Sequence, residues 1–341
     1  MNILVTGGAG YIGSHTTLLL LQAGYNVAVL DNFSNSKPEA LARVAKLAGR
    51  APQIIEGDIR NSELLDQLFR EHTIDAVVHF AGLKAVGESV VKPLEYYDNN
   101  VLGSLRLLQA MKLANVTRIV FSSSATVYGD PASVPIREDF PLSATNPYGA
   151  SKLHIEDMLR DLHGAEPHWR IAILRYFNPA GAHESGQIGE DPNGIPSNLM
   201  PYIAQVAVGK LKELSVYGND SATHDGTGVR DYIHVMDLAQ GHLAALSALY
   251  QYHMITCNLG TGVGYSVLDM VKAFSEASGK SIPYRFVGRR PGDIAECYND
   301  PAHAEALMNW RASRGLEEIC ADHWRWQREN PNGYSKHGNR Q

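Results

Sequence analysis

The sequence predicts an α/β protein built on a doubly wound parallel sheet, followed by a smaller α/β lobe. Short β-branched runs alternate with helix-length segments as far as residue 178, which is the pattern of repeated βαβ units. A glycine-rich turn follows the first run, and beyond residue 178 the chain becomes rich in Gly, Pro and Asn. A chain of 341 residues also exceeds the usual size of one hydrophobic core. We therefore expect two domains, 1–178 and 179–341, with some later elements returning to the first.

The first domain is expected to contain six strands separated by helices. The strands are residues 2–7, 26–31, 53–58, 76–82, 118–124 and 170–178. Segments such as SELLDQLFREH and NVLGSLRLLQAMKLA have helical length and pattern. A further helix is expected to begin at Pro147, because Asn146 suits an N-cap and proline fits the first helical position. The second domain is expected to be isolated helices joined by connections, ending in a loose tail of a dozen residues.

Composition and charge exclude several classes of protein. The net charge of −6 and the lack of a basic block argue against a nucleic-acid partner. Cys257, Cys297 and Cys320 lack C-x-x-C spacing, which offers no metal site and suits a reducing cytosol. No apolar run approaches the roughly 18 residues of a membrane span, and no signal peptide is evident. We expect a cytoplasmic protein with no membrane partner.

The glycine-rich turn has the spacing of a dinucleotide-binding site. In VTGGAGYIGSH, Gly8, Gly10 and Gly13 give G-x-G-x-x-G, while Gly7, Gly10 and Gly13 give G-x-x-G-x-x-G. Both arrangements let the backbone approach a pyrophosphate at the N-terminus of the following helix. The turn lies between a predicted strand and a predicted helix, which is the context that makes such a pattern specific. We therefore expect a Rossmann-like domain that binds a dinucleotide.

Asp31, at the end of the second strand, predicts which dinucleotide is bound. It lies 18 residues beyond Gly13, where its carboxylate can accept bonds from both ribose hydroxyls and would repel a 2′-phosphate. This favours NAD over NADP, although the nearby Lys37 could receive a phosphate. Asp58 ends the third strand and is expected to meet the adenine, to cap the following helix, or both.

Polar side chains follow three further strands, at the edge where ligands of open parallel sheets bind. They are found at Phe80 to Lys84, at Ser122 to Ser124 and at Asn178. Tyr148 and Lys152 are one helical turn apart and face the same way. We expect Ser124 to orient a substrate oxygen, Tyr148 to exchange its proton and Lys152 to hold charge near the phenol. Lys152 and the nicotinamide are expected to lower the pKa of Tyr148 in the NAD-bound protein.

These residues and four longer segments resemble the extended short-chain dehydrogenase/reductase superfamily and, within it, the UDP-glucose 4-epimerase family. The segments are HFAGLKAVGES, FSSSATVYG, LRYFNPAGA and DGTGVRDYIHVMDLA, and the resemblance covers essentially the whole chain. It implies that UDP-glucose and UDP-galactose are interconverted by transient oxidation at C4 with tightly bound NAD. It also implies a homodimer paired through helices of the first domain, such as those after Pro93 and around Tyr148.

The resemblance also assigns residues to the two ligands. Together with the glycine-rich turn, the residues expected to contact NAD are Gly7, Gly10, Tyr11, Ile12, Gly13, Asp31, Asn32, Asn35, Asp58, Ile59, Phe80, Ala81, Lys84, Asn99 and Tyr176. The residues expected to contact the UDP-hexose are Asn178, Asn198, Leu199, Tyr217, Arg230, Arg290, Asp293 and Cys297. The two arginines are forks suited to a diphosphate.

Cys297 departs from the family pattern. The glucose/galactose-restricted bacterial enzymes of this family carry a tyrosine there, which crowds the hexose pocket. The smaller cysteine leaves room for an N-acetyl group, so we expect activity on UDP-GlcNAc and UDP-GalNAc as well. Two alternatives are a buried cysteine without influence on the pocket, and a neighbouring Tyr298 that refills the space.

Two other functions fit parts of the pattern. A 4,6-dehydratase or reductase of the same superfamily could share the cofactor site, but a dehydratase generally needs an Asp-Glu pair after the fifth strand, where this chain has Ala125 and Thr126. A non-catalytic NAD-sensing protein would keep the fold, but it has no need for a phenol beside an ammonium. Incubation with UDP-galactose without added cofactor distinguishes these possibilities.

Overall fold

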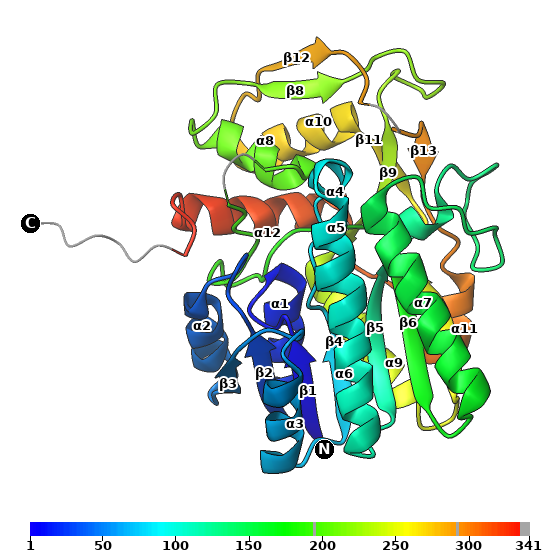
Figure 1. Cartoon of the computed structure of the whole chain (residues 1–341). Coiled ribbons are helices and arrows are strands. Elements are labelled where there is room, and N and C mark those ends of the chain that lie inside the picture. Colours follow the sequence, from blue (N-terminus) through cyan, green and yellow to red (C-terminus); the bar gives the residue numbers. More distant parts are fainter. Residues whose placement is uncertain (194–195, 291–292, 335–341) are drawn as a thin grey trace, which may run out of the picture.

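The computed structural model describes residues 1–193, 196–290 and 293–334, and its centre is a parallel sheet of seven strands (Figure 1). Its strands are β1 (Asn2–Thr6), β2 (Asn26–Asp31), β3 (Gln53–Glu56), β4 (Ala76–His79), β5 (Arg118–Ser124), β6 (Arg170–Tyr176) and β10 (Met254–Leu259). The strand order is β10-β6-β5-β4-β1-β2-β3, and every pairing is parallel. The six predicted strands and the doubly wound sheet are therefore confirmed, and the order reverses between β1 and β4.

Helices cover both faces of this sheet. Alternate strand residues point to opposite faces, so Ile3 and Val5 of β1 join one core and Leu4 joins the other. The first core is completed by α1 (Tyr11–Gln22), α2 (Pro38–Ala48), α9 (Val235–Ala248) and α11 (Ala302–Met308). The second core is completed by α3 (Ser62–Glu71), α6 (Gly103–Leu113) and α7 (Pro147–Ala165). Because both faces are covered, central strands such as β1 and β4 are almost continuously apolar and buried, whereas the edge strand β3 is largely exposed.

Of two connections in this first lobe, one has the structure that the sequence predicted and the other differs from it. The helix at Pro147 is confirmed, because the Asn146 side chain accepts a hydrogen bond from the Gly149 nitrogen at 2.9 Å. Between β4 and α6 lie three short elements, and the last of them takes up residues 100–102 of the helix predicted at 100–114. They are α4 (Val86–Val91), α5 (Pro93–Tyr96) and the π-helical η1 (Tyr97–Leu102). The 3₁₀ turn η2 (Ala125–Tyr128) follows β5.

Beyond residue 178 a smaller lobe has its own core. One small sheet contains β7 (Asn178–Ala180), β9 (Val229–His234), β11 (Gly264–Ser266) and β13 (Glu296–Cys297), and another contains β8 (Leu214–Tyr217) and β12 (Tyr284–Val287). The helices α8 (Leu199–Ala207), α10 (Val267–Ser278) and α12 (Leu316–Glu329) contribute Met200, Phe274 and Ile319 to this core. Each of these strands has only two to six residues, too few for a recognisable pattern.

The chain crosses between the lobes more than once. After β9 it returns through α9 and β10 to the large sheet, runs through β11, α10, β12 and β13 in the smaller lobe, and comes back with α11. Helix α12 then lies across the junction of the two lobes (Figure 1). Asn330 and Tyr334 are buried, so the expected loose tail is wrong for these two residues. The rest of that predicted tail, 335–341, lies outside the described residues. Within the described part of the chain, no helix has the length and apolar character needed to span a membrane.

Candidate functional site

A cavity of about 600 Å³ opens at the carboxyl ends of β1, β2, β4, β5 and β6. The parallel register brings these ends together, since Thr6 lies beside His79 and Ser124 lies beside Tyr176. The predicted cofactor residues that line the cavity are Gly7, Gly10, Tyr11, Ile12, Gly13, Asp31, Asn32, Asn35, Ile59, Phe80, Ala81, Lys84, Asn99 and Tyr176. Tyr148 and Lys152 line the same cavity. The structure therefore brings most of the predicted residues to one place.

The glycine-rich turn leaves the space that a pyrophosphate requires. Gly7 has a φ of 71°, and a Cβ there would lie 2.7 Å from the Ala81 nitrogen. A Cβ on Gly13 would lie 2.2 Å from the Gly7 carbonyl oxygen. Helix α1 begins without a side-chain cap and without an acidic residue in its first turn. Its first amide N–H groups therefore remain for an anion, and these residues fit a dinucleotide.

Asp31 is buried at the end of β2 and shapes the turn around it. Its Oδ2 accepts a hydrogen bond from the Ala9 nitrogen at 2.9 Å. Its Oδ1 accepts bonds from the Phe33 nitrogen at 2.9 Å and the Ser36 hydroxyl at 2.8 Å. A carboxylate oxygen can accept about two hydrogen bonds, so Oδ2 keeps capacity for a ribose hydroxyl.

Asp58 lies beside this cavity and does not form part of its wall. It accepts a hydrogen bond from the Asn32 amide at 3.0 Å and forms an ion pair with Arg60 at 2.8 Å. The hydrogen bonds from Arg60 hold the pKa of Asp58 well below its ordinary value. The alternative prediction that Asp58 caps α3 is wrong, because the Asn61 side chain does so.

The three predicted catalytic residues lie together beside the end of β5. Lys152 Nζ donates a hydrogen bond to the Ser122 carbonyl oxygen at 2.8 Å and lies 6.0 Å from the centre of the Tyr148 ring. The Ser124 side chain lies close enough to the Tyr148 phenol to lower the pKa of the phenol in part. The Ser124 hydroxyl accepts a bond from the Thr126 hydroxyl at 2.9 Å. These contacts fix the geometry of the group, whereas the role of each residue stays a prediction.

Burial determines the pKa values of this group. It raises the pKa of Tyr148 above the ordinary 10.0, and the Ser124 side chain only partly opposes it. It lowers the pKa of Lys152 from 10.5 to about 8, against the attraction of Glu156. In the polypeptide without NAD the pKa of Tyr148 is therefore raised, because loss of water is the largest influence on the phenol. For the NAD-bound protein, a lowered pKa stays a prediction.

A second cavity of about 220 Å³ lies in the smaller lobe. The predicted substrate residues that line it are Asn178, Asn198, Leu199, Tyr217, Arg230, Arg290 and Asp293. Arg230 is on β9 and Arg290 follows β12, so two guanidinium groups from separate elements reach one space. The guanidinium of Arg290 lies over the Tyr217 ring, 3.8 Å from its centre. Ser197 and Asn198 line both cavities, so the two cavities adjoin.

Cys297 is not part of the wall of the second cavity. It belongs to a small core with Phe177 and Ile294, and Ile294 does line the cavity. Burial raises the pKa of its thiol to about 11, so the thiol stays protonated. The Tyr298 ring lies against Gly264, where a Cβ would be 2.9 Å from Tyr298 Cδ1. Because neighbouring residues of an extended chain point to opposite sides, Tyr298 does not refill the space beside Cys297.

The sequence did not indicate Glu190, which connects the two cavities. Its buried Oε1 accepts hydrogen bonds from Lys84 Nζ at 3.2 Å and from Asn198 Nδ2 at 2.9 Å. Its Oε2 has no hydrogen-bond partner among the described residues. The only sequence signal for this residue is an acidic pair within a glycine-rich connection, which predicts neither burial nor a partner.

Asn100 was also missed as a residue that shapes the cavity. Its Oδ1 accepts a hydrogen bond from the Leu83 nitrogen at 2.7 Å, and its Nδ2 donates one to the Leu83 carbonyl oxygen at 3.0 Å. It also donates to the Ser151 hydroxyl of α7 at 3.0 Å. Asn100 lies on the π-helical η1, and such a local widening of a helix often occurs at functional sites but has no clear sequence pattern.

Known proteins similar to this chain match it in length and fold. Residues 4–323 match the family model described as GDP-mannose 4,6 dehydratase. A UDP-glucose 4-epimerase of Bacillus subtilis is 63% identical over 335 residues, covering 98% of this chain and 99% of the relative. That of Mus musculus is 57% identical over 340 residues, covering 97% and 98%. The crystal structure of UDP-glucose 4-epimerase from Bifidobacterium longum in complex with NAD+ and UDP is 55% identical, with a TM-score of 0.95, and the match covers 98% of this chain and all of that chain.

Proposed function

Because this chain belongs to the UDP-glucose 4-epimerase family of extended short-chain dehydrogenases/reductases, we propose that it interconverts UDP-glucose and UDP-galactose with bound NAD. One observation carries the proposal beyond family membership. The cavity that holds Tyr148 and Lys152 adjoins a cavity with two arginines, so a nucleotide sugar could extend from one to the other. This arrangement suits chemistry on a sugar whose diphosphate is held at a distance.

The residues around the first cavity have different roles in the proposed reaction. NAD, when bound, would supply the redox chemistry, which is reversible hydride transfer at C4 of the hexose. The turn at Gly7 to Gly13 would hold the pyrophosphate of the cofactor, and Asp31 would bind its ribose. Tyr148 accepts the proton of the C4 hydroxyl and later returns it, while Ser124 orients the C4 oxygen. The cation of Lys152 stabilises the phenolate near the cofactor.

The residues around the second cavity hold the nucleotide while the hexose turns. Inversion at C4 requires the sugar to present its opposite face, which needs a firm grip on UDP and a loose grip on the hexose. Arg230 and Arg290 suit the diphosphate, because guanidinium groups bind phosphate oxygens in a bidentate manner. Leu199 and Tyr217 offer an apolar and an aromatic surface to the uracil, after Arg290 has moved from the Tyr217 ring.

The test of this proposal is incubation of the purified protein with UDP-galactose and no added cofactor. We expect UDP-glucose to form and acid denaturation to release NAD from the protein. The Tyr148→Phe variant is expected to lose at least about 100-fold in kcat, because proton transfer by a positioned side chain contributes that much. Tyr250→Phe, at an exposed tyrosine, is the matched control. Full activity of Tyr148→Phe would contradict the proposal, and a product lacking one water would indicate a dehydratase.

A second activity, on UDP-GlcNAc and UDP-GalNAc, is favoured by the position of Cys297. The small thiol belongs to the core against which Ile294 packs, Ile294 lines the cavity, and the Tyr298 ring lies against Gly264. Cys297→Tyr is expected to push Ile294 into the cavity, and to lower the rate on N-acetylated substrates at least about tenfold while the rate on UDP-galactose changes little. Cys297→Ser is the control for loss of the thiol. Equal loss on both substrate classes would contradict this proposal.

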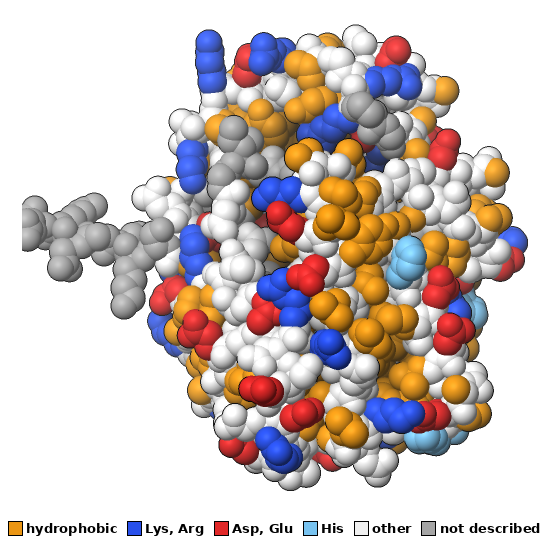
Figure 2. Space-filling model, in the orientation of Figure 1, with side chains coloured by type: hydrophobic (Ala, Val, Ile, Leu, Met, Phe, Trp, Pro, Cys, Tyr) orange, Lys and Arg blue, Asp and Glu red, His pale blue; other side chains and the backbone are white. Residues whose placement is uncertain are grey.

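We also propose that the protein is a cytoplasmic homodimer. Two observations support this proposal, namely the free, buried cysteines Cys257, Cys297 and Cys320 and an exposed apolar patch, and the family resemblance implies the pairing. The patch consists of Val90, Val91, Leu94 and Leu105, and Figure 2 shows hydrophobic side chains gathered over α4, α5 and α6. The two ligands are assigned to the two proposed domains. Residues 1–178 would hold most of NAD, and residues after 178 would hold most of the UDP-sugar.

A further inference from the structure

Lys37 lines the nucleotide cavity, but its ammonium group is already paired. Its Nζ lies 2.5 Å from Oδ2 of Asp191, and both residues line the cavity that contains Asp31. The Asp191 side chain is 15% exposed and that of Lys37 is 38% exposed, so the carboxylate is the more shielded partner. Ser36, the neighbour of Lys37, donates to Asp31 at 2.8 Å. The ion pair therefore borders the loop that shapes the Asp31 end of the cavity.

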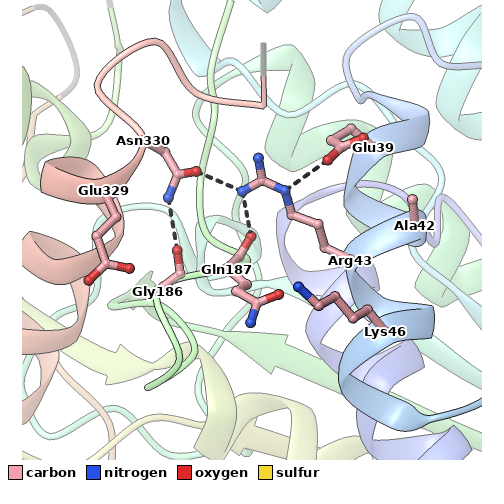
Figure 3. A pocket seen from close by; sticks show the side chains of 8 residues that line it. All are labelled: Glu39, Ala42, Arg43, Lys46, Gly186, Gln187, Glu329 and Asn330. Carbon is pink, nitrogen blue, oxygen red and sulfur yellow. Dashed lines mark hydrogen bonds and ion pairs between the residues drawn. The ribbon is translucent and has the colours of Figure 1, made fainter. Parts of the chain in front are cut away.

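The segment that carries Asp191 is held by contacts independent of this ion pair (Figure 3). On α2, Arg43 Nη1 donates to the Gln187 carbonyl oxygen at 3.0 Å and to Asn330 Oδ1 at 2.6 Å. The Asn330 side chain in turn donates to the Gly186 carbonyl oxygen at 2.8 Å. We expect the segment to stay in place when the ion pair is removed.

Asp191 also has a second fixed contact, which defines where its carboxylate lies. The Tyr334 backbone nitrogen donates to Asp191 Oδ2 at 2.9 Å, and the Tyr334 hydroxyl lies 3.1 Å from both the nitrogen and the carbonyl oxygen of Gly189. The carboxylate is thus held at the cavity wall by a backbone group as well as by Lys37. An amide oxygen at the same position could accept the bond from Tyr334, which makes Asn a conservative replacement.

We propose that Asp191 is a specificity-determining residue that excludes NADP, an inference that rests on the proposed use of a dinucleotide. A 2′-phosphate needs a cation, which NADP-binding proteins supply near the end of the second strand. Here the lysine of that loop is neutralised by Asp191. Entry of a phosphate would have to break this pair and would bring its charge towards Asp31 and Asp191. Asp191 lies 154 residues from Lys37, so the local motif around Asp31 does not reveal it.

The test compares four full-length proteins: the parent, Asp191→Asn, Lys37→Met and the double variant. Each protein is unfolded in urea, freed of nucleotide and refolded with equal concentrations of NAD and NADP. Bound nucleotides are then released and quantified by chromatography. We expect the bound NADP to NAD ratio to rise about tenfold in Asp191→Asn, because a freed cation and one fewer anion favour the phosphate. The double variant, whose local charge equals that of the parent, is expected to keep a ratio close to that of the parent, and Lys37→Met, which leaves Asp191 unpaired, is expected to have a lower ratio.

Each other outcome has a defined meaning. A parent-like ratio in Asp191→Asn would overturn the inference, and an equal rise in the double variant would show that the freed lysine is not the cause. If Asp191→Asn does not refold, Asp191→Ser keeps an acceptor for the Tyr334 nitrogen and gives the same comparison. A parent that prefers NAD but lacks epimerase activity would contradict the proposed function and leave the inference standing. A parent that binds neither dinucleotide would contradict both.

Discussion

At Lys152, burial and function make opposite demands on one amine. The ammonium is needed near the Tyr148 phenol, yet the side chain is only 5% exposed and its pKa falls to about 8. One hydrogen bond to the Ser122 carbonyl oxygen offsets part of the lost hydration. The charge of this residue therefore depends on pH closer to neutrality than that of an exposed lysine, and the cost of burying it should be measurable.

The first prediction concerns this cost and its pH dependence. Because the folded-state pKa of Lys152 is lowered from 10.5 to about 8, the unfolded chain binds a proton in that window that the folded chain has released. Stability rises with pH wherever the unfolded state binds more protons, so the Lys152 contribution is most unfavourable below pH 8 and becomes less so up to 10.5. Relative to Lys152→Met, the free energy of unfolding should rise by on the order of 3 kcal/mol across the window.

Urea unfolding of the nucleotide-free proteins, at intervals below and across this window, measures the difference. Subtracting the Lys152→Met values removes the pH dependence of all other groups. A difference that stays constant with pH would mean that Lys152 keeps its ordinary pKa in the folded chain. A difference that falls with rising pH would mean that its charge is stabilised by the protein.

Residues are predictable from sequence when their partners are close along the chain or belong to a known spacing. The glycine-rich turn and Asp31 lie in one βαβ unit, and the sequence placed both at the cavity. Glu190 and Asp191 were not predicted, because their partners Lys84 and Lys37 are 106 and 154 residues away. Such pairs are created only when the second lobe folds onto the first.

At the scale of elements, α7 illustrates how a local signal and a tertiary contact combine. Asn146 and Pro147 define its start, and hence the positions of Tyr148 and Lys152 on the first two turns. Its attachment to the sheet depends on Glu156, which is fully buried and receives Arg175 of β6 through two bonds, at 3.0 and 2.7 Å. No sequence pattern indicated that this glutamate would be in the core.

The second prediction concerns this attachment. Glu156→Gln should lower the free energy of unfolding by about 3 kcal/mol, because it leaves the buried guanidinium of Arg175 without a counter-charge. Asp157→Asn, at the exposed neighbour on the same helix that pairs with Arg160, is the control and should change stability little. Urea unfolding gives both values. Equal stability of the two variants would contradict a structural role for the buried pair.

The elements that the sequence predicted share one property, which is regular alternation of strand and helix along the first 178 residues. The six predicted strands are apolar runs bounded by turns, and their order along the chain sufficed for the sheet. Strand β10 was missed although it pairs with β6, because it follows a long excursion through the second lobe. The π-helical turn η1 and the short strands β7 and β13 depend on contacts with distant parts of the chain, which a local sequence pattern does not indicate.

At the scale of the whole molecule, the two lobes are joined by chain that crosses between them. The C-terminal helix α12 contributes Trp326 to the first core and Ile319 to the core of the smaller lobe. The cavity for the cofactor is closed in part by Tyr334, which follows this helix. A nucleotide bound in both cavities would therefore contact elements from nearly the full length of the chain.

The last prediction concerns the apolar patch formed by Val90, Val91, Leu94 and Leu105. Leu94 is 80% exposed on α5, and a contiguous apolar surface of this kind favours association with a second surface. Leu94→Asp should convert the proposed homodimer into a monomer, since a dimer would bury the new carboxylate against apolar side chains. Leu113 is equally exposed at the end of α6, outside the patch, so Leu113→Asp is the matched control and should remain dimeric. Sedimentation velocity measures both masses, and circular dichroism verifies that each variant is folded. A parent that is already monomeric, or a Leu94→Asp variant that remains dimeric, would place the contact elsewhere or exclude it.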